Sequence, residues 1–385
     1  MLKRTVYADN SATTRVSDNA LHAMLPYFQE KIGNASSLHA AGREAARALI
    51  HARKQVADAL NAEPNEIYFT SGGTEADNWA IDMIGTHGDI ITSSIEHHAI
   101  LNAAHNRFER DVKALKLMTD CHGHIVPPNE SATRSLVLQN KPVMCSFMFV
   151  NNEIGTIQDL RKLFKIYDGY GLIYHTDAVQ AVGHIPVDVK KLGIDMLSMS
   201  AHKFNGPRGI GALYVRNGVP MYPMICGGGQ ERKMRAGTEN VAGAVGMAVA
   251  LDEAVRFMDE RMAHTDSLKH RFVDACTKNN IRFATTLDDP FSNNTGILSM
   301  RFPEVEAESL LLLLDSFGIC VSTGSACDSK SVNISHVLSA IGLSDTDARS
   351  TIRFSFGHQN TFEEVDYAVD SLAKCIDMIR SVNTV

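Results

Sequence analysis

The sequence lacks the features that mark membrane-spanning and secreted proteins. No uncharged apolar run in its 385 residues approaches the roughly 20 residues that a bilayer span needs, and the longest candidate, 309–317, is interrupted by Asp315. The N-terminus carries no long apolar segment of the kind found in secretion signals. We therefore expect a cytoplasmic protein that makes no membrane contact.

Cysteine and positive charge are also scarce. The seven cysteines are scattered, and no two of them form a C-x-x-C pair, which argues against a disulfide framework and against a structural zinc site. The run 121–124, Cys-His-Gly-His, reads as a polar turn, so we expect no metal. Lys and Arg total 37 against 44 Asp and Glu, giving a formal charge of −7, so no general basic field attracts nucleic acid.

The chain is long enough for one large domain and one smaller domain. Strand-like and helix-like segments alternate through the first two-thirds, which predicts βαβ units and a mainly parallel sheet of the α/β class. The strands are expected at 66–70, 90–93, 143–150, 172–177, 196–200, 211–215 and 220–225, with helices at 40–60, 75–84, 99–108 and 160–170.

The pattern changes after residue 238. A long helical region, 242–279 with a break near Met262, is followed by a β-α-β-α pattern that ends in a helix over 362–380. We predict a large domain over 15–260 and a smaller α+β domain made of 1–14 with 261–385.

The run Ser-Ala-His-Lys-Phe-Asn-Gly-Pro at 200–207 places Lys203 between a short apolar strand and a turn. An amine desolvated there can form a Schiff base with an aldehyde cofactor, although an isolated lysine is more often a surface residue. Asp177 ends another strand and could pair with the pyridinium nitrogen of pyridoxal phosphate (PLP), with Gln180 near the phenolate oxygen. A helix cap is the alternative for Asp177.

Further candidates lie in turns that follow other strands. Gly73 and Thr74 open a helix whose free N–H groups suit a phosphate, or they form an ordinary turn. His97 could stack on a flat cofactor and move protons. Arg353, in an apolar strand, suits a substrate carboxylate or a structural salt bridge.

Two cysteines close together contrast in their surroundings. Cys327 lies among small and polar residues, so we expect it to be exposed and able to ionise, or to be an incidental loop thiol. Cys320 lies in an apolar strand and is most simply a core residue.

Taken in order, these segments resemble the cysteine desulfurases of the NifS/IscS-like group, PLP enzymes of the aspartate-aminotransferase fold. The resemblance runs nearly end to end, and its most specific element is the Gly-Ser-Ala-Cys run that contains Cys327. The segments that carry it are 7–14, 71–75, 151–156, 177–180, 200–203, 227–231, 235–238, 324–327 and 353–355.

The resemblance implies a role for each matching residue. Lys203 corresponds to the Schiff-base lysine, His97 to the ring-stacking acid/base residue and Cys327 to the nucleophile that accepts sulfur. Thr238 corresponds to a phosphate ligand supplied by the second subunit, which implies a homodimer. The remaining matches are Asp177 and Gln180 at the ring, Gly73, Thr74, Ser200 and His202 at the phosphate, and Asn152 and Arg353 at the substrate.

The activity that the resemblance implies is removal of sulfur from L-cysteine, leaving alanine and a Cys327 persulfide. The persulfide would pass to an acceptor protein such as an iron–sulfur scaffold. Selenocysteine lyase and cysteine-sulfinate desulfinase are the alternatives on the same scaffold. Asp328, directly after the cysteine, departs from the hydroxyl residue common there and should raise the pKa of the Cys327 thiol.

Overall fold

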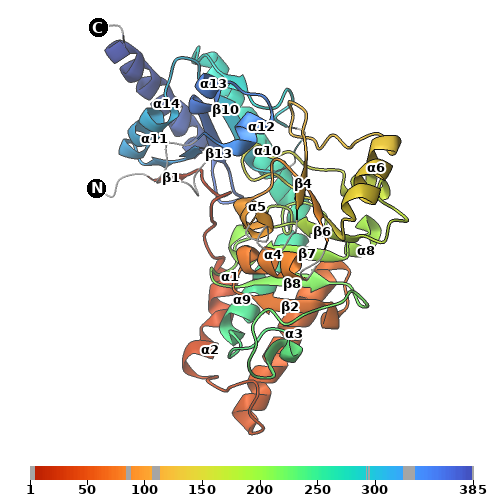
Figure 1. The fold of residues 1–385 in the computed structure, drawn as a ribbon. Helices are drawn as coiled ribbons and strands as arrows, with labels where there is room; N and C mark the ends of the chain where they lie inside the picture. Colours follow the sequence, from red (N-terminus) through yellow and green to blue (C-terminus); the bar gives the residue numbers. More distant parts are fainter. Residues whose placement is uncertain are drawn as a thin grey trace.

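The fold is built around one large sheet, shown in the computed structural model of Figure 1. The structure describes residues 5–83, 88–105, 113–291, 293, 295–323 and 334–383. Seven strands lie in the order β2-β8-β7-β6-β5-β3-β4, and all neighbouring pairs are parallel except the two that involve β8. Their bounds are β2 Ile67–Thr70, β3 Ile90–Ser93, β4 Ala114–Leu117, β5 Met144–Ser146, β6 Ile173–Asp177, β7 Met196–Ser200 and β8 Gly211–Val215.

Helices cover both faces of this sheet, and their apolar spacing explains why they pack there. In α3 the buried residues Ala45, Leu49, Ala52 and Val56 recur every three or four positions, which places them on one face of the helix. The helices of this part are α1 Asp18–Met24, α2 Pro26–Gln29, α3 Ala40–Leu60, α4 Gly73–Asp82, α5 His98–His105, α6 Glu130–Asn140, α7 Leu160–Lys165, α8 Val189–Leu192 and α9 Val241–Arg256.

A second apolar core lies in the C-terminal part of the chain, and it includes Val6 and Ala8 from the N-terminus. An antiparallel sheet there has the order β12-β13-β10-β9, and β1 pairs in parallel with β11 alongside it. Figure 1 shows the N-terminal strand among these C-terminal elements. Their bounds are β1 Val6–Tyr7, β9 Ala284–Thr285, β10 Ile297–Arg301, β11 Ile319–Cys320, β12 Ser322–Thr323, β13 Thr351–Ser355, α10 Met258–Lys278, α11 Ala307–Ser316, α12 His336–Ala340, α13 Asp345–Arg349 and α14 Phe362–Asn383.

The predicted α/β fold is confirmed, with local corrections. The expected strand at 220–225 is wrong: only Ile225 forms a bridge, because Pro220 and Pro223 lack the N–H groups that a ladder requires. The long helical region breaks at Phe257 rather than near Met262. Strand β4 and helix α6 were not expected.

The described part of the chain contains no helix both long and apolar enough to cross a membrane. Nor do the described residues include a group of three or more His, Cys, Asp or Glu side chains arranged to hold a metal ion.

Candidate active site

Six strands that run in one direction end at the same edge of the large sheet, because all of its strands except β8 are mutually parallel. A cavity of about 310 Å³ lies at this edge. Ten of the twelve residues predicted from the sequence line it: Gly73, Thr74, His97, Asn152, Asp177, Gln180, Ser200, His202, Lys203 and Arg353.

Lys203 lies in a short 3₁₀ turn directly after β7, and the N-terminal segment 11–14 holds its side chain. The Lys203 Nζ donates to the carbonyl oxygens of Ser11 at 2.6 Å and Ala12 at 2.9 Å. Gln180 Nε2 donates to the same Ser11 carbonyl at 2.8 Å. One backbone segment therefore fixes both the amine and the amide at the wall of the cavity.

Asp177 and His97 form the charged centre of the cavity. Burial raises the pKa of the Asp177 carboxyl, while His97, the Val179 N–H and Lys203 oppose the rise. Burial lowers the pKa of His97, with Asp177 acting in the opposite direction. The His97 Nδ1 accepts from the Ala99 N–H at 3.1 Å, so the neutral ring carries its proton on Nε2.

Buried carboxyl groups lie behind Asp177. Burial, reinforced by repulsion from Asp177, raises the pKa of Asp77 well above its ordinary value. Burial raises the pKa of Glu96 to about 8. Because His97 and Lys203 both act to lower the pKa of Asp177, it is the carboxyl of this group that is favoured to carry the negative charge.

The opposite end of the cavity suits a phosphate. Helix α4 begins at Gly73 without a side-chain cap, so its first N–H groups remain available for an anion. The close approach of Val179 requires glycine at 73, since an added Cβ would lie 2.6 Å from the Val179 Cγ2. The basic and hydroxyl groups of His202 and Ser200 line the same cavity.

Arg353 lies at the rim that faces the second core. Its Nη2 donates to the Asp9 Oδ1 and its Nη1 to the Asn152 carbonyl oxygen, both at 2.8 Å. Its Nε is buried and has no hydrogen-bond partner among the described residues. This guanidinium is therefore held firmly while its buried Nε–H group remains unsatisfied.

Two predicted residues are not part of this cavity. Thr238 is exposed and is not among the lining residues. Cys327 lies outside the described residues, whereas Cys320 is partly buried in β11.

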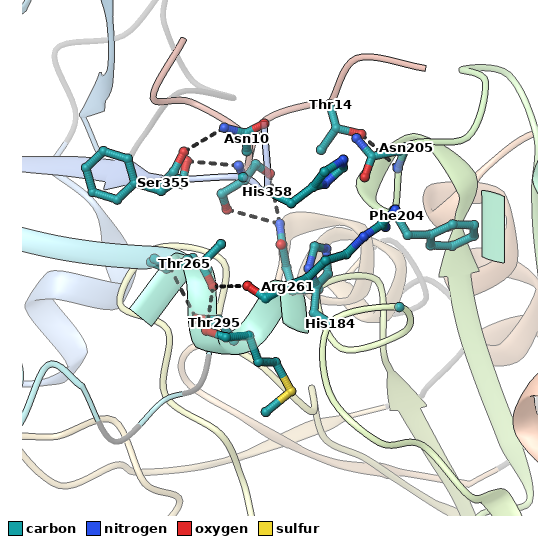
Figure 2. Close-up of a pocket in the computed structure, with 18 of the residues that line it drawn as sticks. Asn10, Thr14, His184, Phe204, Asn205, Arg261, Thr265, Thr295, Ser355 and His358 are labelled. Atoms are coloured by element: carbon teal, nitrogen blue, oxygen red, sulfur yellow. Dashed lines mark hydrogen bonds between the residues drawn. The ribbon is translucent and has the colours of Figure 1, made fainter. Parts of the chain in front are cut away.

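A second, smaller cavity of about 50 Å³ shares Ser11 and Gln180 with the first. Figure 2 shows it lined by polar side chains around Arg261, including His184. The His184 Nε2 donates to the Lys203 carbonyl oxygen at 2.8 Å, so this cavity supports the turn that carries Lys203 from behind.

Sequence reasoning named no role for Ser11 or Asp77, although both line the main cavity. Asp77 follows Gly73 by one helical turn, so the helix geometry of α4 places both on one face. That spacing was the available signal. Ser11 contributes its backbone carbonyl, which accepts from Lys203, and its hydroxyl, which accepts from Gln180 at 3.1 Å and donates to the Asn152 carbonyl oxygen at 2.8 Å.

Comparisons with known proteins agree with this geometry. The aminotransferase class-V family model matches residues 6–368. A cysteine desulfurase IscS from Methanosarcina thermophila is 44% identical, covering 99% of this chain and 94% of that protein. A solved NifS-like protein superposes with a TM-score of 0.89 at 36% identity, covering 97% of this chain and all of the other. The solved structure of SspA in complex with cysteine has a TM-score of 0.79 at 31% identity, covering 93% of this chain and all of the other. The chain therefore belongs to the cysteine desulfurases of the class-V aminotransferase family.

Proposed function

We propose that this protein uses PLP to take sulfur from L-cysteine, releasing L-alanine and leaving a persulfide on Cys327. The observation that carries the proposal is the convergence of Lys203, Asp177 and His97 in one cavity beside the buried Arg353. The cysteine bound in the solved SspA structure supports the same substrate here.

The cavity fits the cofactor in its chemistry. An amine, a buried carboxylate and an uncapped helix start correspond to the aldehyde, ring nitrogen and phosphate of PLP. Lys203 would hold the aldehyde carbon, Asp177 the ring nitrogen and Gln180 the phenolate oxygen. Gly73, Thr74, Ser200 and His202 would bind the phosphate. When bound, PLP withdraws electrons from the α-carbon of the substrate.

Each residue at the site then has its own role in the reaction. Arg353 and Asn152 bind the substrate carboxylate, and the Lys203 amine removes the α-proton. His97 moves a proton at its Nε2. The Cys327 thiolate attacks the substrate sulfur, the carbon–sulfur bond breaks, and its electron pair stays with carbon, which takes up a proton. Sulfur is thereby oxidised to the persulfide level while carbon is reduced to the methyl group of alanine, so no external oxidant is needed.

A homodimer completes the site in this proposal. Thr238 is exposed in the single chain, which suits a residue that supplies a phosphate ligand to a partner copy. Large apolar side chains are also exposed on α1, α2, the loop that follows α2 and the first half of α3, which suits a subunit interface. They are Leu21, Leu25, Phe28, Ile32, Leu38 and Ile50.

The test is a single-turnover experiment on PLP-loaded protein. L-cysteine should give alanine and one persulfide, located at Cys327 by mass spectrometry. Cys327→Ser should still change the cofactor absorbance when cysteine is added but should form neither product. Normal alanine release by Cys327→Ser would contradict the proposal. Faster turnover on selenocysteine or cysteine sulfinate, independent of Cys327, would favour the alternative activities.

A further inference from the structure

The start of helix α12 is attached directly to the turn that carries Asn152. Ser335 caps this helix, and its Oγ accepts from the N–H groups of Val337 and Leu338, each at 3.2 Å. The same hydroxyl donates a short hydrogen bond to the Glu153 Oε2. Ser335 and Glu153 are both buried, so solvent does not compete for this bond.

A second contact fixes the same point of the chain beside His97. The His336 Nε2 donates to the Glu96 carbonyl oxygen at 2.9 Å, and its ring lies 4.7 Å from the ring of His98. Glu96 and His98 are the two sequence neighbours of His97. The start of α12 is thus held by segments that also carry two cavity residues.

The chain before Cys327 is attached at an equivalent place. Strand β12 pairs with β13 so that Ser322 lies opposite Arg353. Arg353 in turn donates to the Asn152 carbonyl oxygen, next to Glu153. The described segments on either side of residues 324–333 are therefore held close to Arg353 and Asn152: Ser322 pairs with Arg353, and Ser335 is bonded to Glu153, the residue after Asn152.

We propose that Glu153, acting through Ser335, is a positioning residue for the transfer of sulfur to Cys327. Cys327 precedes Ser335 by eight residues, a length that can span about 28 Å when extended. Fixing Ser335 near the rim of the cavity limits how far the Cys327 thiol can move away, which raises its effective concentration at the substrate sulfur. The inference rests on the proposed role of Cys327.

The charge state of Glu153 is consistent with this contact. Burial raises the pKa of Glu153 to about 7, while the Ser335 hydroxyl and Arg353 favour the ionised form. Glu153 is not among the residues that line the cavity, but it attracts Arg353, which does; Glu153→Gln removes this attraction while it keeps an oxygen acceptor for Ser335.

The test compares Ser335→Ala with Ser344→Ala. Ser344 caps the next helix, α13, by accepting from the Asp347 N–H at 3.2 Å, and it makes no bond to Glu153. Both variants lose one helix N-cap, but Ser335→Ala also leaves the buried Glu153 carboxyl without its hydroxyl donor, so urea unfolding is measured for both. Two quantities are measured on PLP-loaded protein: the rate of persulfide formation at Cys327, and the absorbance change on cysteine addition.

We expect Ser335→Ala to slow persulfide formation by about tenfold or more, with the half-saturating cysteine concentration of the absorbance change within about twofold of wild type. Ser344→Ala should leave both quantities near wild type. Glu153→Ala should behave as Ser335→Ala does, whereas Glu153→Gln keeps an oxygen acceptor for Ser335 and should retain the wild-type rate.

Equal persulfide rates in Ser335→Ala and Ser344→Ala would overturn the inference. So would a matching loss of the cysteine-induced absorbance change in Ser335→Ala, because that would show damage to the whole site. A slow Glu153→Gln variant would overturn the role of the hydrogen bond. Persulfide formation in Cys327→Ser would instead refute the proposed function, whatever the Ser335 variants do.

Discussion

Replacing Arg353 with lysine keeps the positive charge but removes the fork that binds two partners at once. Arg353 is only 3% exposed, and its two Nη groups donate to Asp9 and Asn152 at 2.8 Å each. A lysine ammonium cannot reproduce this arrangement and also offer an N–H to a substrate carboxylate. Arg353→Lys should therefore lose at least one hydrogen bond that involves a charged group.

Such a bond is worth about 1.5–3 kcal/mol, which corresponds to a loss of about ten- to one-hundred-fold in kcat/KM for cysteine. The assay is steady-state alanine formation on PLP-loaded protein, with the absorbance change on cysteine addition as a separate measure of binding. The loss should appear mainly in KM, because Arg353 binds the carboxylate and not the reacting sulfur. An unchanged KM in Arg353→Lys would refute this reasoning.

Asp9→Asn is the matched control, because it removes the carboxylate partner of Arg353 and leaves the guanidinium in place. Breaking a fully buried pair costs about 3–5 kcal/mol, and the 19% exposure of the Asp9 side chain lowers the expected loss of unfolding free energy to about 2 kcal/mol. Urea unfolding measures this loss. If Asp9→Asn weakens cysteine binding more than Arg353→Lys does, then the ion pair matters because it positions neighbouring groups. Direct binding of the substrate by the Arg353 guanidinium would then be refuted.

Further outcomes are expected at other positions. Lys203→Ala should abolish the borohydride-reducible bond to PLP, and a bond that persists in this variant would refute the assignment of the lysine. Mixed with an inactive Thr238 variant, Lys203→Ala should regain activity after subunit exchange, because each heterodimer would contain one intact site. Cys320→Ser should form persulfide normally and lose roughly 1–3 kcal/mol of stability at most, whereas persulfide on Cys320 itself would contradict the mechanism. Burial raises the pKa of Glu96 from 4.5 to about 8, so the folded protein holds a proton there that the unfolded chain releases. Its contribution to the free energy of unfolding therefore falls between about pH 4.5 and pH 8, and Glu96→Gln should flatten this part of the pH profile in urea titrations.

Much of the sheet was predictable because its strands are short apolar runs bounded by small or polar residues. Strand β3 was predicted at its observed bounds, and the positions of Asp177 and Lys203 at strand ends followed from the same pattern. Parallel strands collect their carboxyl ends at one edge, so residues far apart in sequence could be expected in one place.

Other features could not be read from local pattern. Strand β4 is short, its sequence Ala-Leu-Lys-Leu includes a charged residue, and only Leu117 is buried. Its hydrophobic pattern is therefore too weak to predict a strand. The buried acid Glu96 becomes informative only when the fold brings it near Asp177. The hydrogen bond between Ser335 and Glu153 joins residues 182 positions apart, and neither position is distinctive by itself.

The pairing of β1 with β11 has a consequence for synthesis on the ribosome. Val6 lies opposite Ile319, so the first strand emerges some 300 residues before its partner. The nascent N-terminus must remain unpaired while the large sheet is made, and the C-terminal core, which includes Val6 and Ala8, can close only near the end of translation. The contacts of Lys203 with Ser11 and Ala12 belong to the same segment. A nascent chain that still lacks its last third therefore lacks the C-terminal core that binds β1, so the segment carrying these contacts is anchored late.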